Sequence, residues 1–182
     1  MKTRCSADLS GPARSDEDLL ARYQGGDLDS FGELYRRHSR PLFLYLRVLT
    51  GDSAVAEDAV HEAFMRLLDR VSTTAIDCFR TYLYAAARHI VIDHGRRSEK
   101  RKSSEPLVVL RTAGPGAERG LAEDVSRAIA SLPGDQREVV VLKVYADLTF
   151  AEIAQLTSQP PGTVMSRYRY ALGKLARMLG KA

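Results

Sequence analysis

Apolar residues recur at helical spacing along most of this sequence, and that periodicity limits its fold more than any other feature. In the stretch 53–71, one helical face collects the apolar positions Val55, Ala59, Ala63, Phe64, Leu67 and Leu68. No run alternates apolar and polar residues in the way that a half-buried strand requires. The sequence therefore predicts an all-α protein.

Capping residues and helix breakers divide the pattern into two groups of helices. The first group is expected at about 15–24, 27–49, 53–71 and 78–97. The segments SEKRKSSEP and TAGPGAERG that follow are rich in charge, Ser, Gly and Pro, which predicts a flexible linker. The second group is expected at about 121–131, 133–145 and, as two helices, after residue 149. We therefore expect two small helical domains, 15–98 and 120–180, joined by a linker over 99–119.

Basic residues are concentrated in two segments. The chain as a whole carries a net charge of only +4. In residues 88–102, however, Arg and Lys outnumber the acids, and the last twenty residues contain Arg and Lys but no acid. Such segments are typical of a protein that binds a polyanion. The alternative is a pair of solvated helix faces, which charge alone does not exclude.

Several classes of protein are disfavoured by composition. Cys5 and Cys78 are too few and too scattered for a disulfide framework or a zinc site, which favours a reducing cytoplasm. The chain start lacks the apolar run of a signal peptide, and no stretch reaches membrane-spanning length, so no membrane insertion is expected. The candidate nucleophiles Cys5, Cys78 and Ser166 show no spacing to a base, and no phosphate-binding loop is present. We therefore expect neither an enzyme nor a bound metal or cofactor.

The most specific stretch is TFAEIAQLTSQPPGTVMSRYRYALGKLARML, residues 149–179. Its first residues, Thr149 to Glu152, form a capping box that begins a helix. The segment 158–162 cannot continue that helix because it contains two prolines. A second helix is expected from Thr163, and its buried stripe comprises Val164, Tyr168, Ala171, Leu172, Leu175 and Leu179. This pattern predicts a helix-turn-helix.

The opposite face of the second helix has the composition of a DNA-reading surface. Four residues project outward near its N-terminal end: Gly162, Ser166, Arg169 and Tyr170. Small residues allow a backbone to approach DNA, and the positive end of the helix dipole favours a phosphate. The alternative is an ordinary helical hairpin with a wet basic face.

These motifs resemble those of the extracytoplasmic-function (ECF) sigma factors of bacterial RNA polymerase. The C-terminal half carries Leu132-Pro133, Gln136 to Val139, Glu152-Ile153-Ala154 and Gly162-Thr163-Val164-Met165-Ser166-Arg167. The N-terminal half carries GDLDSFGELYRRHSRPLF, AEDAVHEAFMRLLDRV and FRTYLYAAARHIVIDHGRR, similar to the other domain of that family. The resemblance covers about residues 15–98 and 120–179.

The resemblance implies three contact surfaces. Core polymerase, through the clamp coiled coil of its largest subunit, would contact Glu57, Asp58, His61, Glu62, Phe64 and Arg66. The minus-ten element, opened as single-stranded DNA, would contact the loop 71–77 and Tyr82, Arg88, His89, Arg96 and Arg97. The minus-thirty-five duplex would contact Gly162, Thr163, Met165, Ser166, Arg167, Arg169 and Tyr170. For Phe64 and Tyr82, a stacking role and a core position remain equally open.

Four residues depart from the family pattern. His61 stands where glutamine is usual, Tyr82 where tryptophan is usual, and His89 where asparagine is common. Met165 replaces a basic residue and so removes a phosphate contact, a charge that Arg169 could restore one turn later.

The resemblance also implies further partners of the chain. Domain four is expected to contact the polymerase flap, and a separate anti-sigma factor is expected because the chain has no sizeable regulatory extension. The rival interpretation is a helix-turn-helix regulator that binds operators and never joins polymerase. A regulator of that kind would carry a receiver or ligand-binding domain, and the N-terminal half shows neither.

Overall fold

The computed structural model describes residues 14–71, 76, 78–97 and 117–180. Its helices are α1 (Asp16–Gln24), α2 (Leu28–Thr50), α3 (Ser53–Val71), α4 (Phe79–Arg97), α5 (Ala117–Ala130), α6 (Gly134–Val144), α7 (Phe150–Thr157) and α8 (Pro161–Leu179). No strand occurs within the described ranges. The prediction of an all-α protein is confirmed. Most of the segment expected as a linker lies outside the described residues, and α5 begins at Ala117, inside that expected segment.

Local signals place the boundaries of the N-terminal helices. The Ser15 side chain accepts a hydrogen bond from the Asp18 backbone at 3.1 Å, which satisfies one free donor of the first turn of α1. Helix α2 ends at Gly51, whose φ of 71° is left-handed and therefore suited to glycine. The Asp52 carboxylate accepts from the backbone N–H groups of Ala54 and Val55 and so begins α3.

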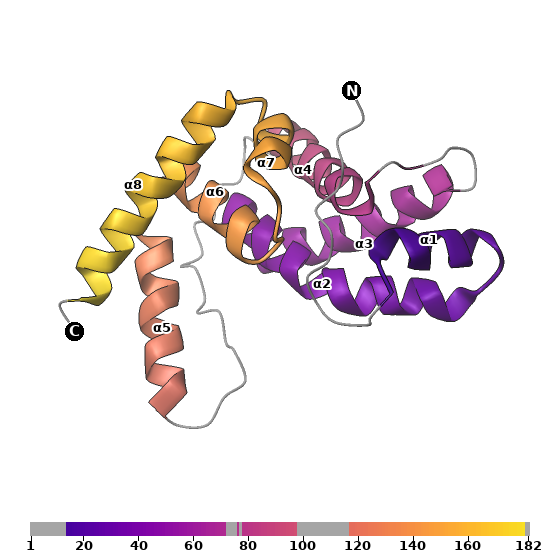
Figure 1. Ribbon diagram of the computed structural model, residues 1–182, viewed down its shortest axis with the longest axis horizontal. Coiled ribbons are helices and arrows are strands. Elements are labelled where there is room, and N and C mark those ends of the chain that lie inside the picture. Colours follow the sequence, from indigo (N-terminus) through magenta and orange to yellow (C-terminus); the bar gives the residue numbers. More distant parts are fainter. Residues whose placement is uncertain (1–13, 72–75, 77, 98–116, 181–182) are drawn as a thin grey trace.

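Helices α1 to α4 pack into the first domain. Leu34, Leu42 and Leu46 of α2 are fully buried, and Leu67 of α3 and Leu83 of α4 are fully buried against them. Ala87 of α4 is also fully buried, whereas its neighbour Ala86 is only partly buried. Figure 1 shows α2, α3 and α4 running side by side with α1 against α2.

A buried carboxylate ties α1 to its neighbours. Asp16 is 8% exposed, and its oxygens lie 2.9 Å from His38 Nε2, 3.4 Å from Arg37 Nη1 and 3.8 Å from Arg80 Nε. Burial raises the pKa of Asp16, but the hydrogen bond to His38 and the charges of His38, Arg80 and Arg37 outweigh burial and hold the pKa below its usual value. The ionised Asp16 therefore stabilises the packing of α1.

Helices α5 to α8 form the second domain, and its core joins that of the first. Val139 to Leu142 of α6, Ile153 of α7 and Val164 of α8 are buried in one continuous apolar cluster with the N-terminal helices. Helices α6 and α7 lie between α8 and the first domain, where α6 packs on α2 and α7 on α4 (Figure 1). The two domains pack against each other, a contact that the sequence did not predict. The reason is that α6 is apolar on more than one side and covers two neighbours.

Cys78, directly before α4, is disulfide-bonded. The only other cysteine of the sequence, Cys5, lies outside the described residues. Sequence reasoning did not foresee a disulfide at Cys78.

Candidate functional site

The turn between α7 and α8 forms as the sequence predicts. Thr149 Oγ1 accepts from the Glu152 backbone at 3.2 Å, and the Glu152 carboxylate accepts from the Thr149 backbone at 2.7 Å, so the expected capping box is confirmed. Helix α7 stops at Ser158, which has a φ of 55°. Helix α8 begins at Pro161, two residues before the expected start, because proline at the first helical position has a suitable φ and no hydrogen to leave unsatisfied.

The buried stripe of α8 holds it on the domain. Val164, Ala171 and Leu175 are buried, and the Tyr168 ring packs against Phe150 with centroids 5.3 Å apart. Leu172, which we expected in the stripe, is 43% exposed. It lies at the edge of the stripe, where no described helix covers it.

The opposite side of α8 is an exposed surface formed by Gly162, Met165, Ser166, Arg169 and Tyr170, here called the α8 face. Met165 is 53% and Tyr170 60% exposed. The Arg169 guanidinium lies 5.7 Å from the centroid of the Tyr170 ring, within the range of a cation–π contact. The α8 face therefore offers one cation, one aromatic ring and one flexible apolar side chain to a ligand.

Glycine at position 162 is not required by packing within the chain. A Cβ placed there would meet no atom within 4 Å, and φ is not left-handed. The absence of a side chain instead leaves the start of α8 open to close approach from outside. This is the property that a helix N-terminus needs when it approaches a phosphate or a base edge.

Arg167 points toward its own domain. Its Nη2 atom lies 2.7 Å from Asp135 Oδ2 at the start of α6, so this arginine links α8 to α6. We expected Arg167 to contact DNA; the structure gives it a partner that sequence reasoning missed. Thr163 is partly buried, and its carbonyl accepts from Ser166 Oγ at 2.9 Å.

The residues expected at the minus-ten element are spread along α4. His89 is exposed, and Tyr82 is partly buried against the core. Arg88 Nε lies 3.1 Å from Glu138 Oε1 of α6, so its guanidinium faces the second domain. Arg96 and Arg97 end α4, and their side chains lie outside the described part of the structure, as do residues 72–75 and 77 of the preceding loop.

The outward side of α3 is mainly acidic and is here called the α3 face: Glu57, Asp58, His61, Glu62, Met65 and Arg66. Glu57, Asp58 and His61 are exposed, and Glu62 pairs with Arg66 at 2.6 Å, one helical turn away. Sequence reasoning missed Met65, which is 47% exposed on this otherwise polar surface. The signal that could have identified Met65 is that this apolar residue lies outside the apolar stripe of its own helix.

Phe64 does not belong to the α3 face. Its side chain is 3% exposed, and its ring packs 4.8 Å from Tyr35 and 6.0 Å from Phe31, measured between centroids. Of the two roles left open for Phe64, the core position is the observed one.

Two features are absent from the described residues. Across the described residues, no three His, Cys, Asp or Glu side chains gather in a way that could hold a metal ion. Nor is any helix in the described ranges both long and apolar enough to cross a bilayer.

The two domains match two family models in sequence order. Residues 34–101 match the family described as sigma-70 region 2, and residues 122–175 match sigma-70, region 4. Among curated relatives, the chain is 31% identical over 168 residues to the ECF RNA polymerase sigma factor SigM of Mycobacterium tuberculosis (strain ATCC 25618 / H37Rv), covering 92% of this chain and 86% of the relative. It is 29% identical over 171 residues to BldN of Streptomyces coelicolor, covering 89% and 65% of the two chains.

Solved structures share the fold. CnrH, in complex with the cytosolic domain of CnrY, matches with a TM-score of 0.62 at 23% identity, over 91% of this chain and 97% of CnrH. The sigma factor RpoE of Bartonella quintana, in complex with the anti-sigma factor NepR, matches with a TM-score of 0.64 at 19% identity, over 84% and 98%. With both sigma regions present in order and a relative above 30% identity along nearly its whole length, this chain belongs to the ECF family of RNA polymerase sigma factors.

Proposed function

We propose that the chain binds core RNA polymerase and directs promoter recognition, DNA opening and the start of transcription. The observation that carries this proposal is the presence in one chain of sigma region 2 and of a region 4 helix-turn-helix whose outward face is exposed and carries Arg169. An operator-binding regulator needs only the second of these.

The α8 face is the proposed reader of the minus-thirty-five duplex. Arg169 would contact a phosphate or a base edge, and the missing side chain at Gly162 would let the helix start approach the groove. Met165 stands where the family has a basic residue, so its contact with DNA would be apolar, for example with a thymine methyl group. Arg167 would act indirectly, because its contact with Asp135 fixes the position of α8.

Helix α4 is the proposed surface for the opened minus-ten element. His89 is exposed, and Tyr82 is accessible enough to offer a ring edge or face to a base. Arg88, Arg96 and Arg97 would supply phosphate contacts along the same helix.

The α3 face is the proposed polymerase contact. Its acidic residues would pair with basic residues of the clamp coiled coil, and the exposed Met65 would add an apolar contact on that surface. Domain four would contact the flap.

The chain would act without catalytic chemistry of its own, as a cytoplasmic protein, since polymerase and chromosome lie there. The cytoplasmic localisation is inferred from the proposed function and not from the cysteines. We also propose control by an anti-sigma factor, the kind of partner with which RpoE of Bartonella quintana was solved.

A pull-down of core RNA polymerase with the purified chain, followed by run-off transcription on a genomic promoter library, tests the proposal. Stable association and new start sites would establish it and map the promoter. DNA binding without association with polymerase would instead identify an operator-binding regulator.

A further inference from the structure

The exposed side of α8 carries two neighbouring side chains that contact each other. The Arg169 guanidinium carbon lies 5.7 Å from the centroid of the Tyr170 ring, a distance at which the charge is attracted to the ring face. Tyr170 is 60% exposed and Arg169 is also exposed, so the contact lies on the surface. Within the described part of the chain, neither side chain has a hydrogen bond or an ion pair besides this contact. The ring is therefore the group that orients the guanidinium.

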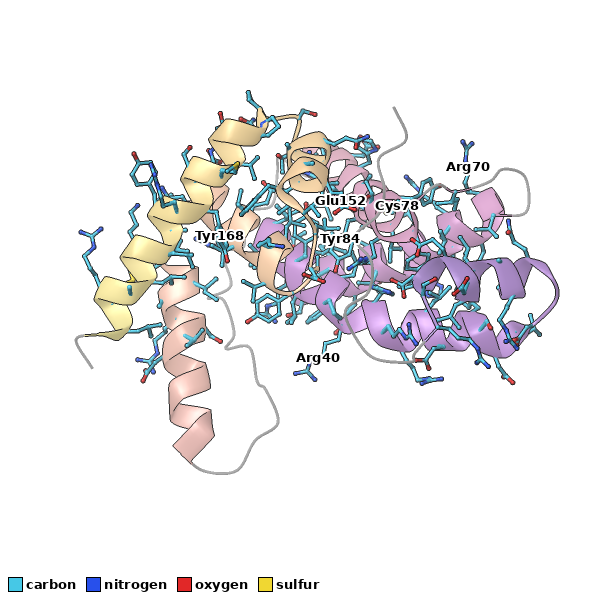
Figure 2. The ribbon with its side chains drawn as sticks, viewed as in Figure 1. Arg40, Arg70, Cys78, Tyr84, Glu152 and Tyr168 are labelled. Atoms are coloured by element: carbon cyan, nitrogen blue, oxygen red, sulfur yellow. The ribbon has the colours of Figure 1, made fainter. Side chains whose placement is uncertain are left out.

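Packing inside the domain does not explain the ring at position 170. Figure 2 shows Tyr168 on the side of α8 that faces the rest of its domain, where its ring packs 5.3 Å from Phe150 between centroids. Two residues along an α-helix correspond to a rotation of about 200°, so Tyr170 lies on nearly the opposite side. The Tyr168 ring serves the core, whereas the Tyr170 ring contacts only the outward face of its own helix.

The residues around the pair leave it room. Helical side chains lean toward the N-terminus of their helix, so Arg169 and Tyr170 extend over the turn that contains Ser166. Ser166 is small, and its hydroxyl donates to the Thr163 carbonyl at 2.9 Å, so it lies back on its own helix. On the next turn, a Cβ built at Gly173 would meet no atom within 4 Å. A ligand can therefore approach the pair along α8 over these two small residues.

An arginine that lies over a ring can still bind a second group. The ring attracts the flat face of the guanidinium, whereas the N–H donors lie in the guanidinium plane and point outward from its edge. Those donors remain available to the oxygens of a phosphate. Contact with the ring also restricts the rotations of the arginine side chain before DNA arrives, so less conformational entropy is lost on binding.

We propose that Tyr170 is a positioning residue, which holds the Arg169 guanidinium ready for a phosphate of the minus-thirty-five duplex and does not itself bind DNA. This inference rests on the proposed function of the α8 face. That face has Arg169 as its single cation, because Met165 stands where the family has a basic residue. The phosphate contact of the α8 face therefore depends on how this one side chain is held.

Three substitutions of Tyr170 separate its ring from its bulk and its hydroxyl. Tyr170→Ala should weaken binding of promoter duplex by about two- to fivefold, the size of a cation–π contact at an exposed site. Tyr170→Phe keeps the ring and should bind like the wild type, whereas Tyr170→Leu keeps apolar bulk without a π face and should bind like Tyr170→Ala. Because Tyr170 is mostly exposed, none of these changes should alter the free energy of unfolding in urea.

The assay is fluorescence anisotropy on a labelled duplex that carries the promoter mapped by run-off transcription, with the full chain bound to core polymerase. The decisive comparison is a double-mutant cycle with Arg169→Gln. Since Tyr170 acts through Arg169, Tyr170→Ala should have no further effect in the Arg169→Gln background. Leu172→Ala is the matched control, because it also removes an exposed apolar side chain from α8, and it should leave the affinity unchanged.

Three outcomes would overturn the inference. An equal loss from Tyr170→Ala in both backgrounds would mean that Tyr170 contacts DNA on its own. A loss in Tyr170→Phe as large as in Tyr170→Ala would assign the effect to the hydroxyl and not to the ring. Unchanged or tighter binding by Tyr170→Ala would mean that the ring does not prepare Arg169 for DNA. The wild-type affinity tests the proposed function separately, because a wild-type complex with polymerase that binds no promoter duplex would refute that function and this inference together.

Discussion

Arg169→Gln should remove one phosphate contact from the binding of minus-thirty-five duplex DNA. Arg169 is exposed on the α8 face and pairs with no acid among the described residues; its described contact is with the Tyr170 ring, 5.7 Å away. Its positive charge is therefore available to a polyanion. Glutamine keeps a polar, shorter side chain and removes that charge.

The magnitude follows from counterion release. Each phosphate neutralised on duplex DNA contributes about 0.9 to the slope of log K against log salt concentration. The slope of Arg169→Gln should be shallower by about 0.9. Between about 50 and 200 mM salt, the wild type should lose about 3.5-fold more affinity than the variant.

The assay is fluorescence anisotropy on a labelled promoter duplex at several salt concentrations, with the full chain bound to core polymerase. Arg127→Gln is the control, because Arg127 is also an exposed arginine of the second domain but pairs with Asp124 on α5. The Arg127→Gln slope should equal that of the wild type. If Arg169→Gln weakens binding while its slope stays that of the wild type, the phosphate contact is refuted.

Three further predictions concern the α3 face and the stability of the fold. Asp58→Lys with Glu62→Lys should weaken polymerase binding in a pull-down by about tenfold through lost charge complementarity; unchanged affinity of a chain with a helical circular dichroism spectrum would contradict the assignment. Thr149→Ala should lower the free energy of unfolding in urea by about 1 kcal/mol, because it removes the cap of α7; no change would show that the cap contributes nothing. The pKa of Asp16 is lower in the folded chain than its ordinary value of 3.8, so its contribution is fully present above that pH and is lost as the pH falls through the folded pKa. Asp16→Asn should therefore be less stable near neutral pH and lose less stability on acidification; parallel unfolding curves for both proteins would contradict this.

Local sequence was enough to predict the helices and most of the helix-turn-helix. The Thr149 cap, the proline pair before Gly162 and the stripe that includes Val164 act within one or two turns of chain. Their effect depends on backbone geometry, which neighbouring residues determine. The same local reasoning placed Arg169 and Tyr170 on the exposed side of α8.

The partners of the charged residues were decided only by the tertiary structure. Arg88 and Arg167 both read as DNA contacts from their position in helices, yet Arg88 meets Glu138, 50 residues away along the chain, and Arg167 meets Asp135 at the start of another helix. Periodicity placed Phe64 on the apolar face of its helix, whereas the family resemblance placed it at the polymerase contact. Its aromatic neighbours, which come from α2, decide for the core.

The packing of the two domains against each other has the same origin. The sequence shows which residues of α6 are apolar, but it does not show which other helices will cover them. Helix α6 packs on α2 and does not face solvent because this packing buries apolar area. It also brings the Glu138 carboxylate within hydrogen-bonding distance of Tyr45 and Arg88. These contacts exist only once all the helices are packed, because they join residues that lie far apart along the sequence.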